Sequence, residues 1–298
     1  MKILLIGATG QLGGDIVRNN QGHDILAPDR ATLDISKPEQ MGEVIRAHRP
    51  GMVINCAAFH NVPQCEDHPE QAFRINCVAV RDLAGVCRDI GAWLVTFSTD
   101  YVFGGEKRAP YLEDDRPAPL QVYGITRLAG EHAALAMAPD RAVVIRTCGL
   151  FGRSGAKSKG GNFVDNRVKD ARAGALIEMS SEQTISPTST HDLSRAVLAL
   201  IAHPQFRPGI YHLANEGACT WYELTCAIIE TLGLKTEVRP VDRGGRTGNM
   251  RRPLYSALAN TRARALGITL RPWREALADH VRASYPEAFE APSRSGRG

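Results

Sequence analysis

Short apolar runs alternate with longer amphipathic stretches over the first half of the chain. The apolar runs predict strands that are buried on both faces of a sheet, over residues 2–6, 24–27, 52–58, 93–97 and 142–147. Between them, apolar residues at helical spacing predict helices over 15–19, 38–48, 69–90 and 120–136. Strands that alternate with helices in this way predict an α/β fold with a doubly wound, Rossmann-type parallel sheet.

Beyond residue 150 the alternation loosens. Further helices are predicted over 162–173, 192–202, 221–232, 261–266 and 273–285, with strands near Ile177 and over 210–213. We therefore predict a nucleotide-binding Rossmann domain over 1–150, with returning segments near 185–215. Residues 151–290 form mainly a smaller, partly interleaved substrate-binding domain, and residues 291–298 are expected to be a disordered tail.

The first apolar run leads directly into glycines at positions 7, 10 and 13, followed by the first helix. Gly7 permits a tight turn, Gly10 lets backbone N–H groups approach a pyrophosphate, and Gly13 lets the helix pack close to the strand. A strand, a glycine turn and a helix N-terminus in this order indicate a dinucleotide-binding unit. The alternative is an ordinary glycine-rich turn.

The second strand ends in Asp29 and Arg30, where a Rossmann unit contacts the adenosine ribose. Asp29 could accept hydrogen bonds from a ribose 2′-hydroxyl, which favours NAD, and Arg30 could pair with a 2′-phosphate, which favours NADP. We favour NADPH and leave NADH open.

Polar residues follow the fourth strand, at the edge of the sheet where ligands bind in open α/β folds. Thr99 lies at the end of this strand, and Tyr123 and Arg127 stand four residues apart on the following helix. This spacing puts a cation beside a phenol, which favours the phenolate and lowers the phenol pKa. A hydroxyl, a phenol and a cation around one carbonyl are suited to acid–base chemistry.

The composition is that of an ordinary globular protein, with 298 residues, 43% hydrophobic content and a net charge of +4. The small charge excess is spread along the chain and gives no indication of nucleic-acid or membrane partners. Seven cysteines without a Cys-x-x-Cys pair indicate a reducing compartment. Because no apolar run approaches the length of a membrane span and a strand begins at residue 2, we expect a cytoplasmic protein.

Several motifs together resemble the dTDP-4-dehydrorhamnose reductases, a family of extended short-chain dehydrogenase/reductases. The resemblance extends from residue 1 to about 285. Its motifs are GATGQLG (7–13), NCAA (55–58), STDYVFGG (98–105), PYLEDDRPAPLQVYG (110–124), RLAGE (127–131), GNFV (161–164), SPT (186–188), RRPLYSAL (251–258) and LGITLRPWREAL (266–277).

The resemblance implies that NAD(P)H reduces the C4 ketone of a nucleotide-linked 6-deoxy-4-keto sugar, yielding dTDP-L-rhamnose. By position, Tyr123 would give the proton, Thr99 would hydrogen-bond the substrate carbonyl, and Arg127 would hold the nicotinamide ribose. The cofactor-binding residues are then Gly7, Gly10, Gln11, Leu12, Gly13, Arg30, Asp34, Ile35, Ala57, Ala58, Tyr123 and Arg127. The substrate-binding residues are Thr99, Asp100, Tyr123, Gly149 and Asn162. Family members that form magnesium-linked dimers leave a homodimer open, but we assign no metal site.

The sequence departs from the family pattern at two positions. Arg127 replaces the usual lysine, and a guanidinium cannot make the same contacts as an ammonium without adjustment. Gly149 stands where relatives commonly have a tryptophan of the nucleotide-sugar pocket. Two alternatives therefore remain. One is another nucleotide-sugar 4-ketoreductase or epimerase, and the other is a non-catalytic NADP-binding regulatory subunit.

Other candidate residues carry weaker signals. His60, Cys65 and His68 fit no standard zinc spacing, so we interpret their segment as a loop beside the active site. Trp221 and Trp273 are predicted to pack in the core. Arg251 and Arg252 could bind a substrate phosphate or form a solvated charge pair, and the sequence does not decide between these.

Overall fold

The computed structural model describes residues 1–154, 161–248 and 250–289. The predicted tail over 291–298 and most of the Gly/Ser/Lys loop near 153–161 lie outside the described residues. The division of the chain into two domains stays a prediction.

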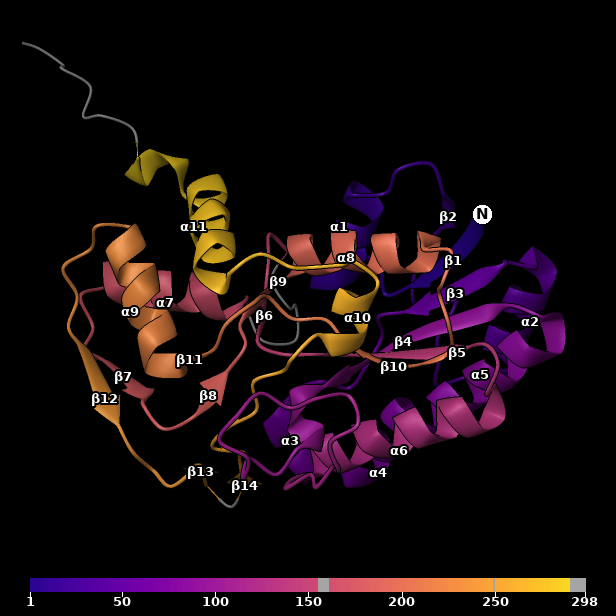
Figure 1. Cartoon of the computed structure of the whole chain (residues 1–298), viewed down its shortest axis with the longest axis horizontal. Helices are drawn as coiled ribbons and strands as arrows, with labels where there is room; N and C mark the ends of the chain where they lie inside the picture. Colours follow the sequence, from indigo (N-terminus) through magenta and orange to yellow (C-terminus); the bar gives the residue numbers. More distant parts are fainter. Residues whose placement is uncertain (155–160, 249, 290–298) are drawn as a thin grey trace, which may run out of the picture.

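A six-stranded, wholly parallel sheet forms the centre of the molecule and confirms the predicted fold class (Figure 1). Its strands, in spatial order, are β10 (Gly209–His212), β5 (Ala142–Thr147), β4 (Trp93–Thr99), β3 (Met52–Asn55), β1 (Lys2–Ile6) and β2 (Asp24–Leu26). The chain leaves β1 toward β2 and then returns to the other side of β1 to form β3. The order of the strands therefore reverses between β1 and β3, which is where doubly wound sheets bind their ligands.

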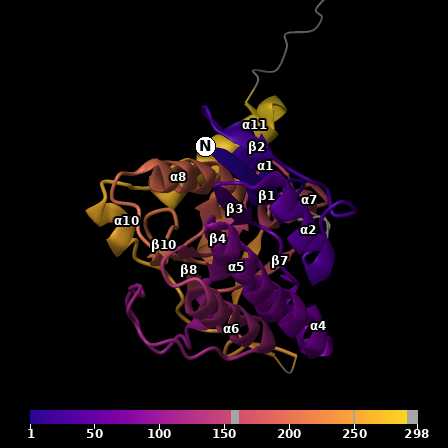
Figure 2. The same cartoon turned by 90° about the vertical axis from the view of Figure 1, so that its right-hand side faces the viewer.

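Helices cover both faces of this sheet (Figures 1 and 2). One face carries α1 (Gln11–Arg18), α8 (Thr190–Ala202) and α10 (Thr261–Ala265). The opposite face carries α2 (Pro38–His48), α5 (Ala79–Ile90) and α6 (Val122–Met137). Both layers pack on apolar strand residues, which explains why the strands read as continuous apolar runs.

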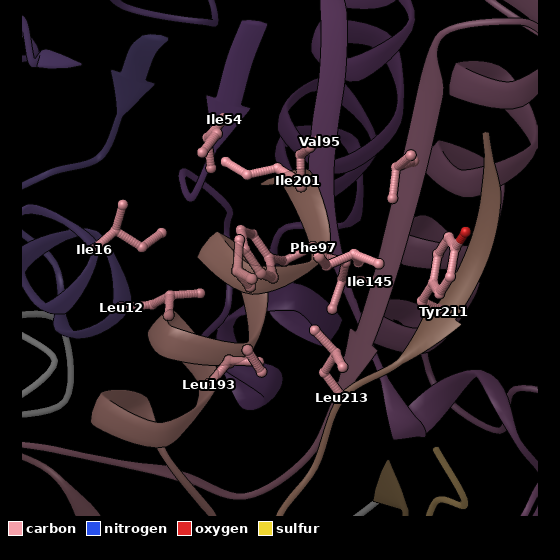
Figure 3. Packing of buried hydrophobic residues seen from close by; sticks show 14 of the residues in the cluster. Leu12, Ile16, Ile54, Val95, Phe97, Ile145, Leu193, Ile201, Tyr211 and Leu213 are labelled. Carbon is pink, nitrogen blue, oxygen red and sulfur yellow. The ribbon is translucent and has the colours of Figure 1, made fainter. Parts of the chain in front are cut away.

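The core beneath α1 and α8 joins segments that are far apart in the sequence. Figure 3 shows Leu12 and Ile16 of α1 near Leu193 of α8, with Phe97 of β4 between the layers. Burial of such large side chains stabilises the fold by roughly 1.5–3 kcal/mol each. This packing fixes α1, and therefore the glycine loop before it, against the sheet.

A second hydrophobic cluster lies beyond the strand ends. Val102 and Phe103, which follow β4, and Cys148, which follows β5, pack there with Trp273. The helices around it are α7 (Phe163–Arg172), α9 (Trp221–Thr231) and α11 (Trp273–Ser284). Both tryptophans pack as predicted, since Trp273 is buried and Trp221 contacts Phe163.

Short strands and turns complete the fold. The strands are β6 (Leu150–Phe151), β7 (Ile177–Ser180), β8 (Thr184–Ile185), β9 (Thr188–Ser189), β11 (Cys219–Thr220), β12 (Val238–Val241), β13 (Arg246–Thr247) and β14 (Met250–Arg251). The remaining helical segments are α3 (Val62–Asp67), α4 (Pro69–Phe73), a π-helical segment over Arg74–Val78, and 3₁₀ turns over Asp100–Val102 and Pro286–Ala288.

Two predicted segments need correction. The single helix expected over 69–90 is interrupted by the π-helical segment, where the side-chain oxygen of Asn76 accepts a hydrogen bond from the backbone N–H of Phe59. Gly130 of α6 approaches so closely here that a Cβ on it would lie 2.1 Å from the Asn76 carbonyl oxygen. The segment around His60 and His68 is not simply a loop, because α3 forms within it.

Candidate active site

The glycine loop between β1 and α1 is too tightly packed for side chains. Gly7 has a φ of +83°, and a Cβ on Gly13 would lie 2.3 Å from the Gly7 carbonyl oxygen. The Gly10 N–H donates to that carbonyl at 3.0 Å and closes the turn. The N-cap residue, Gly10, has no side chain, and no other side chain in the described part of the chain accepts the first N–H groups of α1. The first N–H groups of the helix are thus available to a negative ligand such as a pyrophosphate.

Gln11 and Leu12 contribute differently to this loop. The Leu12 side chain is buried in the core, so it can offer a ligand only its backbone. The Gln11 side-chain oxygen is buried and has no hydrogen-bond partner in the described part of the chain. An orphaned acceptor at the start of α1 is suited to a ligand donor, because leaving it unpaired costs free energy.

The residues predicted to hold the adenosine end lie together after β2. Arg30 donates to Asp34 at 3.1 Å, and 84% of the Arg30 side chain is exposed. Burial opposes the lowering of the Asp34 pKa, but hydrogen bonds from Ser36 and Arg30 outweigh it. Ile35 is buried in the core below. Because an exposed ion pair is weak, the Arg30 guanidinium remains available to a phosphate.

The loops after β1 and β3 meet at the reversal of strand order. A Cβ on Gly7 would lie 3.2 Å from the backbone nitrogen of Ala57. Asn55, the last residue of β3, accepts a hydrogen bond from the Ala57 N–H at 3.1 Å and so shapes the turn toward Ala58. The structure thus brings Ala57 against the glycine loop.

Tyr123, Thr99 and Arg127 come together at the end of β4. Tyr123 is half-buried in the first turn of α6, and its hydroxyl shares a hydrogen bond with the Thr99 side chain. Burial raises the pKa of the Tyr123 phenol above its ordinary value, although the Arg127 charge and the Thr99 hydrogen bond act to lower it. The predicted net lowering of this pKa is therefore wrong, because loss of hydration outweighs the nearby cation.

Arg127 is almost fully buried, with an exposed fraction of 6%. Its Nε atom has no hydrogen-bond partner among the described residues. Glu131, which lies one helical turn further and could have accepted Arg127, instead binds Arg146 at 2.7 Å. A buried cation without a carboxylate partner is costly, so this position is suited to a polar ligand.

The Asp100 carboxylate is directed to internal partners. It accepts hydrogen bonds from the hydroxyls of Thr99 at 3.0 Å and Ser256 at 2.5 Å. Burial raises the pKa of Asp100. The Tyr101 N–H donates to the Thr99 hydroxyl oxygen at 3.2 Å. Asp100 therefore orients Thr99, and this geometry does not display its carboxylate as a substrate ligand.

Gly149 and Asn162 lie on the side of the second hydrophobic cluster. Gly149 has a φ of +52°, and a Cβ there would lie 3.0 Å from the Ile185 side chain. Asn162 is buried, and its side-chain oxygen caps α7 by accepting the Asp165 N–H at 2.9 Å. Its amide nitrogen donates to the Gly152 carbonyl at 2.6 Å. The structure thus gives Asn162 a capping role.

Sequence reasoning did not identify the contact between Tyr101 and Arg252. Arg252 Nη1 donates to the Tyr101 hydroxyl at 2.9 Å, and the Tyr101 ring packs edge-on against that of Tyr123. Arg252 was singled out as a basic residue, but no local pattern pairs it with a tyrosine 151 positions earlier.

Within residues 1–154, 161–248 and 250–289, no group of three or more His, Cys, Asp or Glu side chains could hold a metal ion. None of the helices in the same ranges is long and apolar enough to cross a membrane. All seven cysteines fall in the described part of the chain, and none of them forms a disulfide.

Comparison with known proteins gives consistent matches. The family model for the RmlD substrate binding domain matches residues 1–285. The chain is 36% identical to a dTDP-4-dehydrorhamnose reductase of Mycolicibacterium smegmatis, covering 98% of this chain and 88% of that protein. It is also 36% identical to a dTDP-4-keto-6-deoxy-D-glucose reductase of Streptomyces niveus, covering 92% and 94%. A crystal structure of dTDP-4-dehydrorhamnose reductase from Bacillus anthracis in complex with NADP is 32% identical, with a TM-score of 0.87 over 94% of this chain and 98% of that one.

Proposed function

Because the chain belongs to the dTDP-4-dehydrorhamnose reductase family, we propose that it is an oxidoreductase that uses NADPH to reduce the C4 ketone of a nucleotide-linked 6-deoxy-4-keto sugar. Its substrate is dTDP-4-dehydrorhamnose and its product dTDP-L-rhamnose. The observation that supports this best is the meeting of Tyr123, Thr99 and Arg127 at the end of β4.

The residues present fit the cofactor. The tight glycine loop suits the pyrophosphate, exposed Arg30 suits a 2′-phosphate, and the unpartnered Nε of Arg127 suits a ribose hydroxyl. When bound, NADPH supplies the hydride that adds to C4 of the sugar.

The chain supplies the proton. Tyr123 gives its phenolic proton to the oxygen that develops negative charge at C4, and its raised pKa keeps it protonated until then. Thr99, oriented by Asp100, binds the Tyr123 hydroxyl. The Arg127 charge stabilises the phenolate that remains after the proton has left.

Oxidation of NADPH in the presence of dTDP-4-dehydrorhamnose tests this proposal. We expect substrate-dependent loss of NADPH absorbance for the unmodified chain and a loss of about 10²- to 10⁴-fold in kcat for Tyr123→Phe. The control is the same variant's affinity for NADP⁺, which should fall far less than kcat because the glycine loop and Arg30 still hold the cofactor. If the unmodified chain binds NADP⁺ but does not oxidise NADPH in the presence of the sugar, the proposal is contradicted and a regulatory subunit is favoured.

A second candidate substrate is the diastereomeric 4-keto sugar, dTDP-4-keto-6-deoxy-D-glucose. The 36% identical dTDP-4-keto-6-deoxy-D-glucose reductase of Streptomyces niveus supports it. Gly149 adds to this support only by removing contact area where relatives commonly have tryptophan, so that the sugar pocket differs from theirs. Comparing kcat/KM for the two sugars decides between them, and a higher value for the glucose-derived ketone would overturn the rhamnose assignment.

We further propose a cytoplasmic homodimer. The absence of disulfides among the seven cysteines supports a reducing compartment. Light scattering of the purified chain tests the dimer, and a monomeric mass over the working concentration range would exclude it.

A further inference from the structure

Two arginines beside Tyr123 lack a carboxylate partner among the described residues. Arg127 is one, and Arg252 is the other. Arg252 is half-buried, and its Nη1 donates to the Tyr101 hydroxyl. Its Nε is buried and has no hydrogen-bond partner within 1–154, 161–248 and 250–289. Partly burying a guanidinium is costly unless a negative group compensates it. An anionic ligand is suited to supply that compensation for Arg252.

Arg252 lies one aromatic ring away from the reacting centre. The rings of Tyr101 and Tyr123 have their centroids 6.2 Å apart, and the Arg252 guanidinium carbon lies 6.0 Å from the Tyr101 centroid. Val62 of α3 and Met250 of β14 complete the same cluster, which places the β13–β14 hairpin against the active site. Figure 1 shows β14 near α3, at the lower edge of the molecule.

The segment that carries Arg252 is fixed by backbone contacts. The Arg252 N–H donates to the Gly245 carbonyl at 2.7 Å, and the Glu182 carboxylate accepts the Gly245 N–H at 2.7 Å. A Cβ on Gly105 would lie 2.6 Å from the Leu254 backbone nitrogen, so the loop after β4 packs directly on this segment. Arg252 is thus held in place before any ligand arrives, which reduces the entropy lost on binding.

We infer that Arg252 binds the diphosphate of the nucleotide sugar while Tyr123 protonates the oxygen at C4. This inference rests on the proposed function. The diphosphate is attached at C1, across the sugar ring from C4, so a cation one aromatic ring away from Tyr123 is suited to bind it. The planar guanidinium can bind phosphate oxygens in a bidentate manner. Arg251, one residue earlier, is exposed.

Binding of dTDP to the NADP⁺-loaded chain, measured by calorimetry, tests this inference. We expect Arg252→Met to weaken dTDP binding by about 10- to 100-fold, the value of a lost hydrogen-bonded charge contact. Affinity for thymidine, which lacks phosphates, should change less than about twofold because the nucleoside contacts remain. The matched control, Arg251→Met, removes the neighbouring charge and should leave dTDP affinity unchanged.

The cofactor also carries a diphosphate. Measuring NADP⁺ affinity shows whether Arg252 binds the diphosphate of the cofactor or that of the nucleotide sugar. If Arg252→Met weakens NADP⁺ binding more than dTDP binding, the inference is overturned in favour of the cofactor. If Arg252→Met and Arg251→Met lose the same dTDP affinity, the inference is overturned, because the loss then reflects the net positive charge of the surface and not a specific contact.

Two further variants apply if Arg252→Met does not fold. Arg252→Lys keeps the charge and loses the bidentate fork, and Tyr101→Phe removes only the hydroxyl that orients the guanidinium. Both should weaken dTDP binding, and unchanged affinity in both would overturn the inference. Because binding is measured without turnover, its failure is distinct from failure of the NADPH oxidation assay on the unmodified chain.

Discussion

Glu66 on α3 accepts a hydrogen bond from the backbone N–H of Val122, with 2.7 Å between the carboxylate oxygen and the nitrogen. Val122 is the first residue of α6, and Gln121 before it makes no capping bond. A helix leaves its first N–H groups without intrahelical partners. A carboxylate from a distant segment therefore caps the helix that carries Tyr123 and Arg127.

Replacing Glu66 by alanine should lower the free energy of unfolding by about 1 kcal/mol, the typical value of a helix N-cap. It should also lower kcat, because Tyr123 lies in the first turn that the cap holds. Urea denaturation and the NADPH oxidation assay measure the two effects. Asp67→Asn, which removes an exposed neighbouring charge, is the control. If both variants behave alike, the cap does not position Tyr123.

Replacing Arg127 by methionine should shift the pH dependence of kcat. Tyr123 acts as an acid, so kcat falls as the pH rises through the pKa of its phenol. Arg127 lowers that pKa against the larger effect of burial. Its loss should therefore move the fall in kcat to higher pH. In Arg127→Lys, which keeps the charge, the pH at which kcat falls should stay closer to that of the unmodified chain.

The pH profile of kcat measured over the alkaline range checks this shift. Arg116→Met, which removes an exposed arginine, is the control. If kcat of Arg127→Met falls at a lower pH than kcat of the unmodified chain, the cation does not lower the pKa of the phenol.

Replacing Glu131 by glutamine should destabilise the fold strongly. Glu131 and Arg146 form an ion pair with only 2% of each side chain exposed, and the Ser98 hydroxyl also donates to Glu131. Loss of one partner leaves a buried charge uncompensated, which costs about 3–5 kcal/mol. Urea denaturation measures the change.

The exposed pair of Arg88 and Asp89 provides the comparison for this prediction. Arg88→Met should cost less than about 1 kcal/mol, because exposed ion pairs contribute little. Equal losses from the buried and the exposed pair would contradict the assignment of Glu131 as a structural partner.

His212 should make the fold sensitive to acid. Burial lowers the pKa of this histidine from 6.5 to about 4, with Arg146 acting in the same direction and Glu113 opposing it. Between these pH values the unfolded chain binds a proton that the folded chain does not, so stability falls as the pH decreases from 6.5 to about 4. The slope approaches about 1.4 kcal/mol per pH unit, the value for one proton.

Denaturation midpoints over this pH range measure the slope. His212→Gln should flatten it, whereas replacing the exposed His132 should leave it unchanged. An unaltered slope in His212→Gln would assign the acid sensitivity to other groups.

Replacing Gly149 by alanine should cost more stability than replacing Gly91. Both glycines have a positive φ, which disfavours any side chain by roughly 1 kcal/mol. A Cβ on Gly91 would meet nothing within 4 Å, but one on Gly149 would lie 3.3 Å from the Pro187 Cα as well as against Ile185. Thermal denaturation compares the two, and equal losses would show that the loop adjusts without strain.

The sequence predicted the sheet and the glycine loop well, because both depend on local patterns. Helix α2 begins at Pro38 and ends at His48 as expected, since its apolar spacing and its proline at the start are local signals. The meeting of Tyr123, Thr99 and Arg127 was also predictable, because Thr99 lies at a strand end and Tyr123 and Arg127 share one helix face.

The remaining features depend on contacts between distant segments. No local pattern predicts that Glu66 caps α6, that Asn76 widens a helical turn, or that Arg252 meets Tyr101. The direction in which the Tyr123 pKa shifts from its ordinary value was predicted wrongly for a related reason. The spacing of Arg127 is visible in the sequence, but the burial that outweighs it is a property of the assembled fold.

The position of β10 has a consequence for how the chain folds during translation. β10 covers the outer side of β5, yet its residues, Gly209–His212, follow β5 by more than 60 positions. Until they leave the ribosome, the backbone groups on that side of β5 are unpaired and can template pairing with another nascent chain. Chains that stop before residue 209 should therefore aggregate, whereas chains that extend past residue 212 can close the sheet.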